Sequence, residues 1–285
     1  MIAQNFEYSA PTTLKEALGL LAQDDAKALA GGMSLIPLMK LRLAAPGQLV
    51  DIGRIKDLNF IHDEGGTLRI GATTTHYQVE SSPLVRSKCP LLAEAAAHIG
   101  DIQVRNMGTM GGSIAHADPA ADYPASLLAL EAKVALVSAK ARRELPIADF
   151  FVDTFTTALE PGEIIESVIL PVEDQSIGTS YQKNIQPASG FAIVGVAARI
   201  RKTGGKIAMA RVGVTGLSGK AFRATAVEKA LEGTAGSPSD IQKASAIVAD
   251  GVDANSDLHA SSDYRKHLAR VYSMRALGVA ISRTA

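Results

Sequence analysis

The sequence has a single cysteine, no tryptophan and few aromatic residues, which make up 5% of its 285 positions. One thiol, Cys89, cannot form an internal disulfide or a CxxC redox pair. It also cannot hold an iron–sulfur cluster alone, because such clusters usually take four protein thiolates. The six histidines are scattered and form no HExxH sequence or His/Cys cluster. We therefore expect no zinc site and no other metal ligands in this chain.

An excess of charge of either sign is also lacking, since 29 basic residues balance 29 acidic ones. This balance gives no electrostatic reason to expect nucleic acid or an anionic membrane as a partner. The longest nearly apolar run, Phe191–Ala198, is far too short for a transmembrane segment. The first residues lack the basic region and apolar core of a signal peptide. These absences predict a cytoplasmic protein.

A length of 285 residues allows two or three compact units, and a hydrophobic fraction of 47% is ample for a buried core. The pattern predicts an α/β unit over about residues 1–56, in which Thr13 and Ser34 begin helices over 14–21 and 35–43. Its strands are expected over 26–30 and 49–52. Further helices are expected over 77–79, 90–99, 124–130, 224–231, 238–248 and 262–281, the last two capped by Ser237 and Ser262. Further strands are expected over 60–61, 68–70, 134–138, 143–146, 163–170, 181–185, 191–201 and 206–215.

Two glycine pairs, within Ala30–Ser34 and Thr109–Ser113, are the most informative feature that is present. Each interrupts an apolar stretch and is followed by a hydroxyl residue. A backbone without side chains can approach a phosphate closely and point its N–H groups at the charge. The alternative for any Gly-Gly sequence is a strand-to-helix turn without a ligand. Two such turns together predict a clamp for the pyrophosphate of a dinucleotide, without the GxGxxG spacing of a Rossmann site.

The second pair lies in an expected long loop between two helices, from Gly100 to Pro124. A loop of this length in a compact chain is usually functional or disordered. Asp118 and Asp122 are candidates for helix caps, for an acid–base or metal pair, or for acceptors of ribose hydroxyl groups. Pro119 separates them, which disfavours a metal. His116 is a candidate for a hydrogen-bonded loop histidine or a catalyst.

One other segment, Gly213–Gly219, superficially resembles a phosphate loop. It lacks both GxGxxG and GK[ST] spacing, so it is expected to be a strand end and turn.

Taken together, these motifs resemble a known family. Ala30–Leu35 followed by Pro37-x-Met39-Lys40, and Gln103–Ser113 followed by Asp118–Asp122, are similar to the FAD-binding motifs of the medium subunit of molybdenum hydroxylases. This family includes the carbon monoxide dehydrogenase medium subunit and the FAD subunits of xanthine dehydrogenase type. The resemblance covers the whole chain, including Arg223–Gly233 and Tyr264-Arg265 in the C-terminal part.

The resemblance implies an α+β chain with a vanillyl-alcohol-oxidase-like (PCMH-type) FAD-binding fold. The FAD-binding domain would cover residues 1–172, as two α/β subdomains over about 1–56 and 57–172. A C-terminal domain of antiparallel sheet and helices would cover 173–285.

It also implies roles for individual residues, none of them catalytic. The pyrophosphate would lie on Ala30, Gly31, Gly32, Met33, Ser34, Leu35, Thr109, Gly111, Gly112 and Ser113. Asp122 would contact the ribose, Ile99 and Gly100 the adenine end, and His116 the phosphates. Lys183, Ile165 and Phe191 would lie at the isoalloxazine ring.

Non-covalent FAD is expected, because flavin is tethered through His or Cys in many relatives of the broader fold, whereas the first glycine loop here has Met33 and no histidine, and Cys89 lies outside both motifs. The family implies a flavin electron-transfer subunit. An iron–sulfur small subunit would carry [2Fe-2S] clusters, and a large subunit the molybdenum cofactor, in a dimer of heterotrimers.

Electrons would pass from the clusters to FAD and on to a quinone, NAD or oxygen, with the complex in the cytoplasm or at the inner face of the membrane. Two alternatives are a self-sufficient flavin oxidase or reductase on the same fold and a cofactor-free assembly subunit. Carbon monoxide, a purine, an aldehyde and an N-heterocycle all remain candidate substrates.

Overall fold

A small parallel sheet opens the chain in the computed structural model, which describes residues 2–284. Its strands β1 (Glu7–Ser9), β3 (Gln48–Asp51) and β2 (Ala26–Leu29) lie in that order. Helix α1 (Leu14–Leu21) and the 3-10 turn η1 (Lys56–Leu58) pack against it, and α2 (Leu35–Lys40) follows β2. The Thr13 hydroxyl caps α1 as predicted by accepting the Glu16 N–H.

The predicted end of α2 and its cap need correction. Ser34 precedes α2, but its side chain makes no capping hydrogen bond. The helix ends at Lys40 rather than Leu43, because Arg42 takes the left-handed conformation (φ +61°) that terminates helices.

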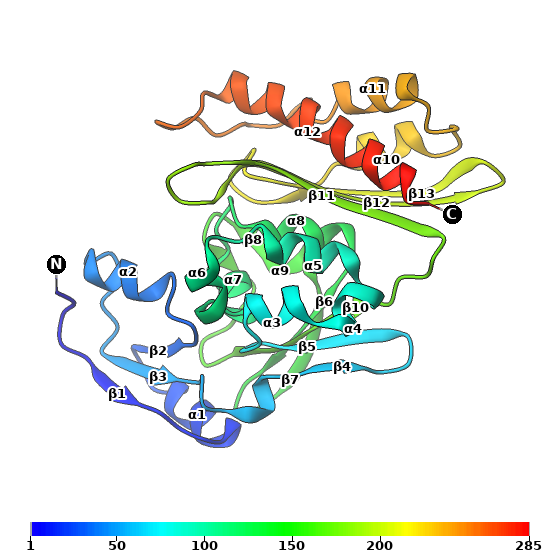
Figure 1. Ribbon diagram of the computed structural model, residues 1–285. Helices are drawn as coiled ribbons and strands as arrows, with labels where there is room; N and C mark the ends of the chain where they lie inside the picture. The colour runs from blue at the N-terminus through cyan, green and yellow to red at the C-terminus, as the bar shows by residue number, and fades with distance from the viewer. Residues whose placement is uncertain (1, 285) are drawn as a thin grey trace.

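A five-stranded antiparallel sheet forms one outer layer of the molecule (Figure 1). Its order is β4 (Ile61–Asp63), β5 (Thr67–Gly71), β10 (Ile164–Pro171), β6 (Lys133–Val137) and β7 (Arg142–Pro146). A layer of helices covers one face: α3 (His76–Ser81), α4 (Pro83–Lys88), α5 (Pro90–Ala97), α6 (Ile102–Met107), α7 (Met110–His116), α8 (Asp122–Ala129) and α9 (Ile147–Phe150). The small hairpin β8 (Phe151–Asp153) and β9 (Thr156–Thr157) follows α9.

The expected long loop between Gly100 and Pro124 is wrong, because α6 and α7 occupy most of it. Asp101 caps α6 by accepting the Val104 N–H at 2.8 Å, and Thr109 caps α7 in the same way. Glycine has a poor helix propensity, so the Gly111-Gly112 pair in α7 does not indicate a helix. Burial of Met110 and Ile114 on its inner face stabilises the helix nevertheless.

The C-terminal part contains a second antiparallel sheet of β11 (Ile177–Ile185), β12 (Ala192–Thr203), β13 (Lys206–Thr215) and β14 (Phe222–Arg223). Helices α10 (Thr225–Leu231), α11 (Pro238–Ala246) and α12 (Ser262–Ser282) cover its outer face, while α5 and α8 pack on its inner face (Figure 1). Ser237 caps α11 as predicted, but α12 is capped by Ser261 and not by Ser262.

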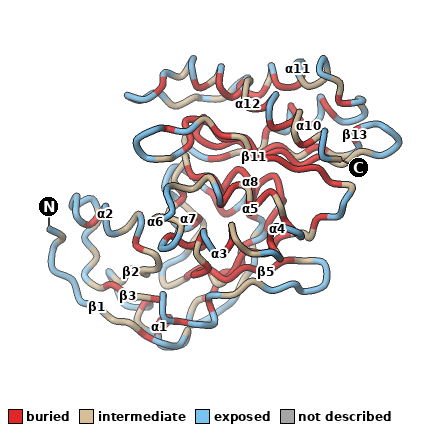
Figure 2. The backbone as a smooth tube through the Cα atoms, in the orientation of Figure 1, coloured by how far each residue is buried: buried red, intermediate tan, exposed pale blue. Residues whose placement is uncertain are grey.

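Helices and sheets therefore alternate in four stacked layers, with the β1–β3 unit at one side (Figure 1). Burial is greatest where layers meet, along α5, α8 and the C-terminal sheet (Figure 2). Every residue of α8 is buried, because this helix lies between the two large sheets. Within residues 2–284, none of the helices combines the length and the apolar character needed to cross a bilayer.

Candidate cofactor site

The first glycine pair forms a loop between β2 and α2. Gly32 takes φ +73°, a conformation that favours glycine. Among the described residues, the N–H groups of Gly31, Gly32, Met33 and Ser34 donate to no protein acceptor. Successive peptide N–H groups of this kind form a concave cradle that favours an anion.

The second glycine segment lies directly against this loop. A Cβ atom at Gly31 would collide with the Met107 carbonyl oxygen and lie 2.9 Å from Gly108 Cα. The Gly108 carbonyl accepts the backbone N–H of His76 at 3.0 Å, which fixes the end of α6 against α3. Two motifs separated by about seventy residues of sequence are thus brought together by glycine-to-backbone packing.

The second pair does not, however, present free N–H groups as the sequence hypothesis assumed. The N–H of Gly111 donates to Ala72 O at 2.8 Å, and that of Gly112 donates to Thr109 Oγ1 at 3.1 Å. The neighbouring Met110 and Ser113 N–H groups also have backbone acceptors. A Cβ atom at Gly111 would lie 2.6 Å from Ala72 Cβ. Gly111 therefore allows close packing of α7, and the free N–H cradle belongs to the first loop alone.

A buried ionic pair lies at the start of α8. Lys183 Nζ on β11 is 2.8 Å from Asp122 Oδ1, and the two side chains are 0% and 4% exposed. The Tyr181 hydroxyl also donates to Asp122 Oδ1, at 2.6 Å. Burial raises the pKa of Asp122 to about 6, against the opposing effect of Lys183 and Tyr181. The contact of Asp122 with a ribose stays a prediction.

Lys183 also joins this pair to the end of α5, where Nζ donates to the His98 carbonyl at 2.8 Å. Close by in sequence, Gly100 lies against the loop before β12: a Cβ atom at Gly190 would be 3.2 Å from Gly100 Cα. Ile99, Gly100, Lys183 and Phe191 therefore lie in neighbouring segments of the fold. The sequence hypothesis assigned the first two to adenine and the last two to isoalloxazine. Both assignments stay predictions.

The remaining predicted residues are less closely grouped. The His116 ring lies 5.0 Å from that of Phe155 in the β8–β9 hairpin, and burial lowers the pKa of His116. Ile165 is 3% exposed and packs inside the main hydrophobic core. Asp118 Oδ1 accepts the Ala120 N–H at 2.8 Å, so its partner is local backbone. Gly213–Gly219 is a strand end and turn, as predicted.

Sequence reasoning missed His76, which is 4% exposed and lies beside Gly108. Its Nδ1 atom is 3.2 Å from the Tyr123 hydroxyl, and burial, with a smaller effect of Arg105, lowers its pKa to about 4. The capping box of Thr75 and Gln78 marks the start of α3. No sequence signal, however, brings His76 to the second glycine segment.

Within residues 2–284 there is no group of three or more His, Cys, Asp or Glu side chains arranged to hold a metal ion. What the site offers is a cradle of free peptide N–H groups, two closely packed glycine segments and a buried ionic pair. A phosphate-bearing organic cofactor fits these features, because free peptide N–H groups bind anions. The fold and site thus define a nucleotide-cofactor protein.

Comparison with known proteins defines the class further. The family model for the FAD binding domain in molybdopterin dehydrogenase matches residues 4–173, and that for the CO dehydrogenase flavoprotein C-terminal domain matches residues 179–280. The chain belongs to the FAD-binding medium subunits of the molybdenum hydroxylases. It is an oxidoreductase subunit, and the predicted family and α+β fold with a C-terminal domain are confirmed.

Individual relatives are similar over their whole length. The chain is 40% identical to the carbon monoxide dehydrogenase medium chain of Hydrogenophaga pseudoflava, over 100% of both chains. It is 38% identical to the glyceraldehyde dehydrogenase medium chain of Sulfolobus acidocaldarius, over 97% of this chain and 98% of that one. The solved carbon monoxide dehydrogenase of H. pseudoflava that lacks the Mo-pyranopterin moiety has a TM-score of 0.97 at 41% identity, with both chains fully covered.

Proposed function

We propose that this chain binds FAD non-covalently, with the pyrophosphate on the Ala30–Ser34 loop. The observation that carries the proposal is the row of N–H groups from Gly31 to Ser34 that has no acceptor among the described residues. Unsatisfied peptide donors are costly unless water or a ligand accepts from them. The second glycine segment supports the cradle from behind through Met107 and Gly108.

The isoalloxazine ring belongs, in this proposal, at the end defined by Gly100, Lys183 and Phe191. Ile99 and Gly100 are thereby moved from the adenine end, because they share that end with Lys183. Phe191 is 41% exposed and offers an aromatic face. Lys183 and Asp122 supply a fixed, nearly dry pair of charges beside it.

Bound FAD would supply redox chemistry that accepts electrons from [2Fe-2S] clusters on a small subunit and delivers them to a quinone, NAD or oxygen. The chain has one thiol and cannot hold such clusters itself. Substrate oxidation would take place at a molybdenum cofactor on a large subunit, in a cytoplasmic dimer of heterotrimers. This chain's own residues hold and orient the cofactor and exclude water from the Asp122–Lys183 pair.

The substrate of the complex is not set by this chain. Relatives of nearly equal identity, 40% and 38%, carry the names of enzymes for carbon monoxide and for glyceraldehyde. A medium subunit that serves such different substrates contributes the same electron transfer to each. Carbon monoxide, a purine, an aldehyde and an N-heterocycle therefore stay open for the large subunit.

An anaerobic reduction experiment tests the proposed function. The purified chain is loaded with FAD, and flavin absorbance is followed after addition of dithionite, of carbon monoxide, or of an aldehyde or N-heterocycle. We expect dithionite to bleach the flavin of the lone chain. We expect the substrate to bleach it only when both partner subunits are present. Acid precipitation should release all flavin into the supernatant.

Each alternative gives a different result in this experiment. Bleaching of the lone chain by an organic substrate or carbon monoxide would favour the self-sufficient oxidase. A colourless chain that takes up no added FAD would favour the assembly subunit. Yellow colour retained in the acid pellet would contradict non-covalent binding.

A further inference from the structure

The loop over residues 186–191 joins β11 to β12 and ends at Phe191. It lies against the backbone at Gly100, since a Cβ atom at Gly190 would come within 3.2 Å of Gly100 Cα. Gly190 takes φ +76°, which a larger residue would adopt only with strain. The position of this loop therefore decides where the exposed ring of Phe191 lies relative to Gly100 and Lys183.

Gln186 organises the loop from within. Its backbone N–H donates to Phe191 O and its carbonyl accepts from Gly190 N, both at 2.9 Å. Its side-chain Oε1 accepts from the backbone N–H and from the hydroxyl of Ser189. Gln186 is 8% exposed, so these bonds are largely shielded from water. One buried side chain thus closes the whole loop.

The other half of the Gln186 amide points to the segment before α12, which contains His259. Because Oε1 faces the two Ser189 donors, the amide nitrogen Nε2 faces His259 Nδ1, at 3.2 Å. The amide Nε2 of Gln186 is a donor, so Nδ1 of His259 accepts. The proton of the neutral His259 ring therefore lies on its own Nε2 atom. The geometry fixes both the orientation of Gln186 and the tautomer of His259.

His259 is itself held by a rigid turn. Asp257 Oδ1 accepts the backbone N–H of His259 at 2.9 Å and that of Ala260 at 3.0 Å. Arg265 on α12 donates to Asp257 Oδ2 at 2.6 Å and to the carbonyls of Ile193 and Gly216. A continuous chain of hydrogen bonds therefore runs from α12 through His259 and Gln186 to the loop.

We propose that Gln186 and His259 are positioning residues that hold the 186–191 loop, and with it Phe191, against Gly100 at the ring end of the cofactor site. The inference rests on the proposed function for what occupies that end. Without the pair, the loop keeps its backbone bonds and the bond from the Phe191 N–H to Ser189 Oγ. Ordering the loop on binding would then cost conformational entropy. Neither residue touches the cofactor in this proposal; both act through Phe191.

The absence of tryptophan allows a direct test. Phe191→Trp gives the full chain one tryptophan, whose fluorescence reports on the loop alone. Gln186→Leu, His259→Ala and their double variant are made in this background. The exposed residues Gln175 and His267 provide matched controls as Gln175→Leu and His267→Ala. Iodide quenching and anisotropy are measured without FAD, and quenching of Trp fluorescence by added FAD is then titrated.

We expect both single variants to increase iodide quenching and lower the anisotropy without FAD, with the double variant no more affected than Gln186→Leu. The FAD dissociation constant should rise about tenfold in His259→Ala, which loses one hydrogen bond, and by more in Gln186→Leu, which loses three. The two controls should match the parent. His259 is exposed, so His259→Ala tests the pair even if Gln186→Leu fails to fold.

Unchanged iodide quenching and anisotropy in His259→Ala would overturn the inference, whatever happens to FAD binding. Additive effects in the double variant would also overturn it, because the two residues would then act separately. A different result identifies failure of the proposed function. If the parent binds no FAD, or binds FAD that leaves Trp fluorescence unquenched, the ring end is wrongly placed, and a role in flavin positioning is overturned with it.

Discussion

Gly31 is the residue at which the two glycine segments touch. We expect Gly31→Ala to lower FAD affinity by tenfold or more, on the order of the 1–3 kcal/mol typical of an overpacked site. Its Cβ atom would meet backbone, at Met107 O and Gly108 Cα, and backbone cannot move aside as a flexible side chain can. The measurement is a FAD titration, with folding checked by thermal denaturation.

Gly19→Ala is the matched control, because nothing lies within 4 Å of its Cβ position on α1. It should leave FAD affinity unchanged. Equal affinities of Gly31→Ala and wild type would show that close contact of the two segments is not needed for binding.

His76 gives a prediction about acid stability. Its folded-state pKa of about 4 lies below the ordinary value of 6.5, so the unfolded chain takes up a proton first as the pH falls. Stability due to neutral His76 is fully present above pH 6.5 and is lost as the pH falls toward 4. The loss amounts to at most about 3 kcal/mol.

Burial of Asp122 acts in the opposite direction over part of the same range, so the comparison must be between variants. We expect the free energy of unfolding of wild type to fall more steeply than that of His76→Gln between about pH 7 and about pH 4.5. Urea denaturation at the two pH values checks this. His267→Gln, a change on the exposed face of α12, should behave like wild type; parallel slopes for His76→Gln and wild type would contradict a buried neutral His76.

At the scale of elements, the contact of α8 with β13 joins the two halves of the molecule. β13 approaches so closely that a Cβ atom at Gly213 would collide with the Ala125 carbonyl oxygen. The same helix carries Asp122, so its position also sets the Asp122–Lys183 pair. The Asp122–Lys183 pair therefore requires the close approach of α8 to the C-terminal sheet.

We expect Gly213→Ala to lower the free energy of unfolding by roughly 1–3 kcal/mol, because the added methyl group must push β13 from α8. Denaturant unfolding measures the change. Gly278→Ala is the control: it lies on α12 with open space around its Cβ position, and should be neutral or slightly stabilising. Equal stability of Gly213→Ala and wild type would mean that the two layers separate without cost.

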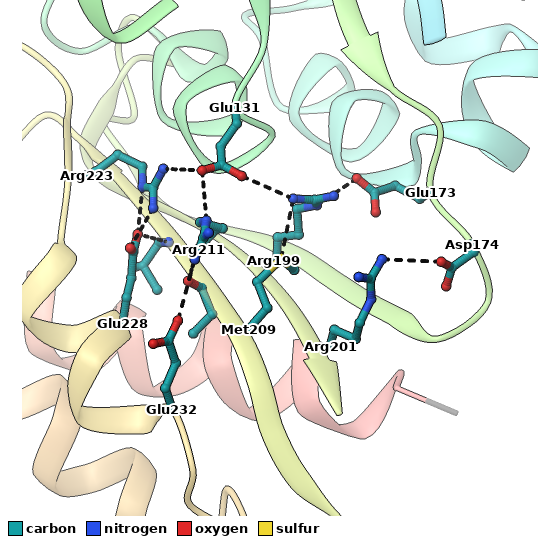
Figure 3. Close-up of polar contacts among 12 residues, drawn as sticks. Glu131, Glu173, Asp174, Arg199, Arg201, Met209, Arg211, Arg223, Glu228 and Glu232 are labelled. Atoms are coloured by element: carbon teal, nitrogen blue, oxygen red, sulfur yellow. Dashed lines mark hydrogen bonds and ion pairs between the residues drawn. The ribbon is translucent and has the colours of Figure 1, made fainter. Parts of the chain in front are cut away.

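At the scale of the whole molecule, an ionic network links the helical layer to the C-terminal sheet (Figure 3). Glu131, just after α8, lies 2.9 Å from Arg211 and 3.0 Å from Arg223. Glu173, in the segment before β11, lies 2.8 Å from Arg199, and this second pair is nearly buried. Arg199, Arg211 and Arg223 on the C-terminal sheet thus pair with carboxylates that precede this sheet in the sequence.

Glu131→Gln should lower stability by about 1 kcal/mol, a small value because the Glu131 side chain is 46% exposed to screening solvent. The loss should shrink as salt is added, since salt weakens the wild-type pairs. Melting temperatures at low and high salt measure both effects. Glu64→Gln removes a similar exposed pair with Arg69 within one sheet, and we expect it to have a smaller effect. A salt-independent loss in Glu131→Gln would contradict an electrostatic link.

The sequence alone predicted most elements of the fold, because periodicity, caps and turn residues are local signals. The strand over Lys206–Thr215 has the predicted bounds, and the capping of α1 and α11 agrees. Helix α7 was missed because its stability comes from packing that outweighs the poor propensity of glycine. Helix α6 has no buried residue and is marked in the sequence only by its cap, Asp101. The family was identified from the motifs, because the residues of a motif depend more directly on function than on the fold.

What only the tertiary structure decided is which residues meet. The sequence named Gly31, Gly100, Asp122 and Lys183, but only folding joins Lys183 to both Asp122 and the end of α5. It also uses the Gly111 and Gly112 N–H groups internally and leaves those of the first loop free. Hydrogen-bond partners far apart in sequence depend on the packing of whole layers, and no local pattern encodes that packing. The motifs therefore determined the kind of cofactor site, and the contacts between layers determined its geometry.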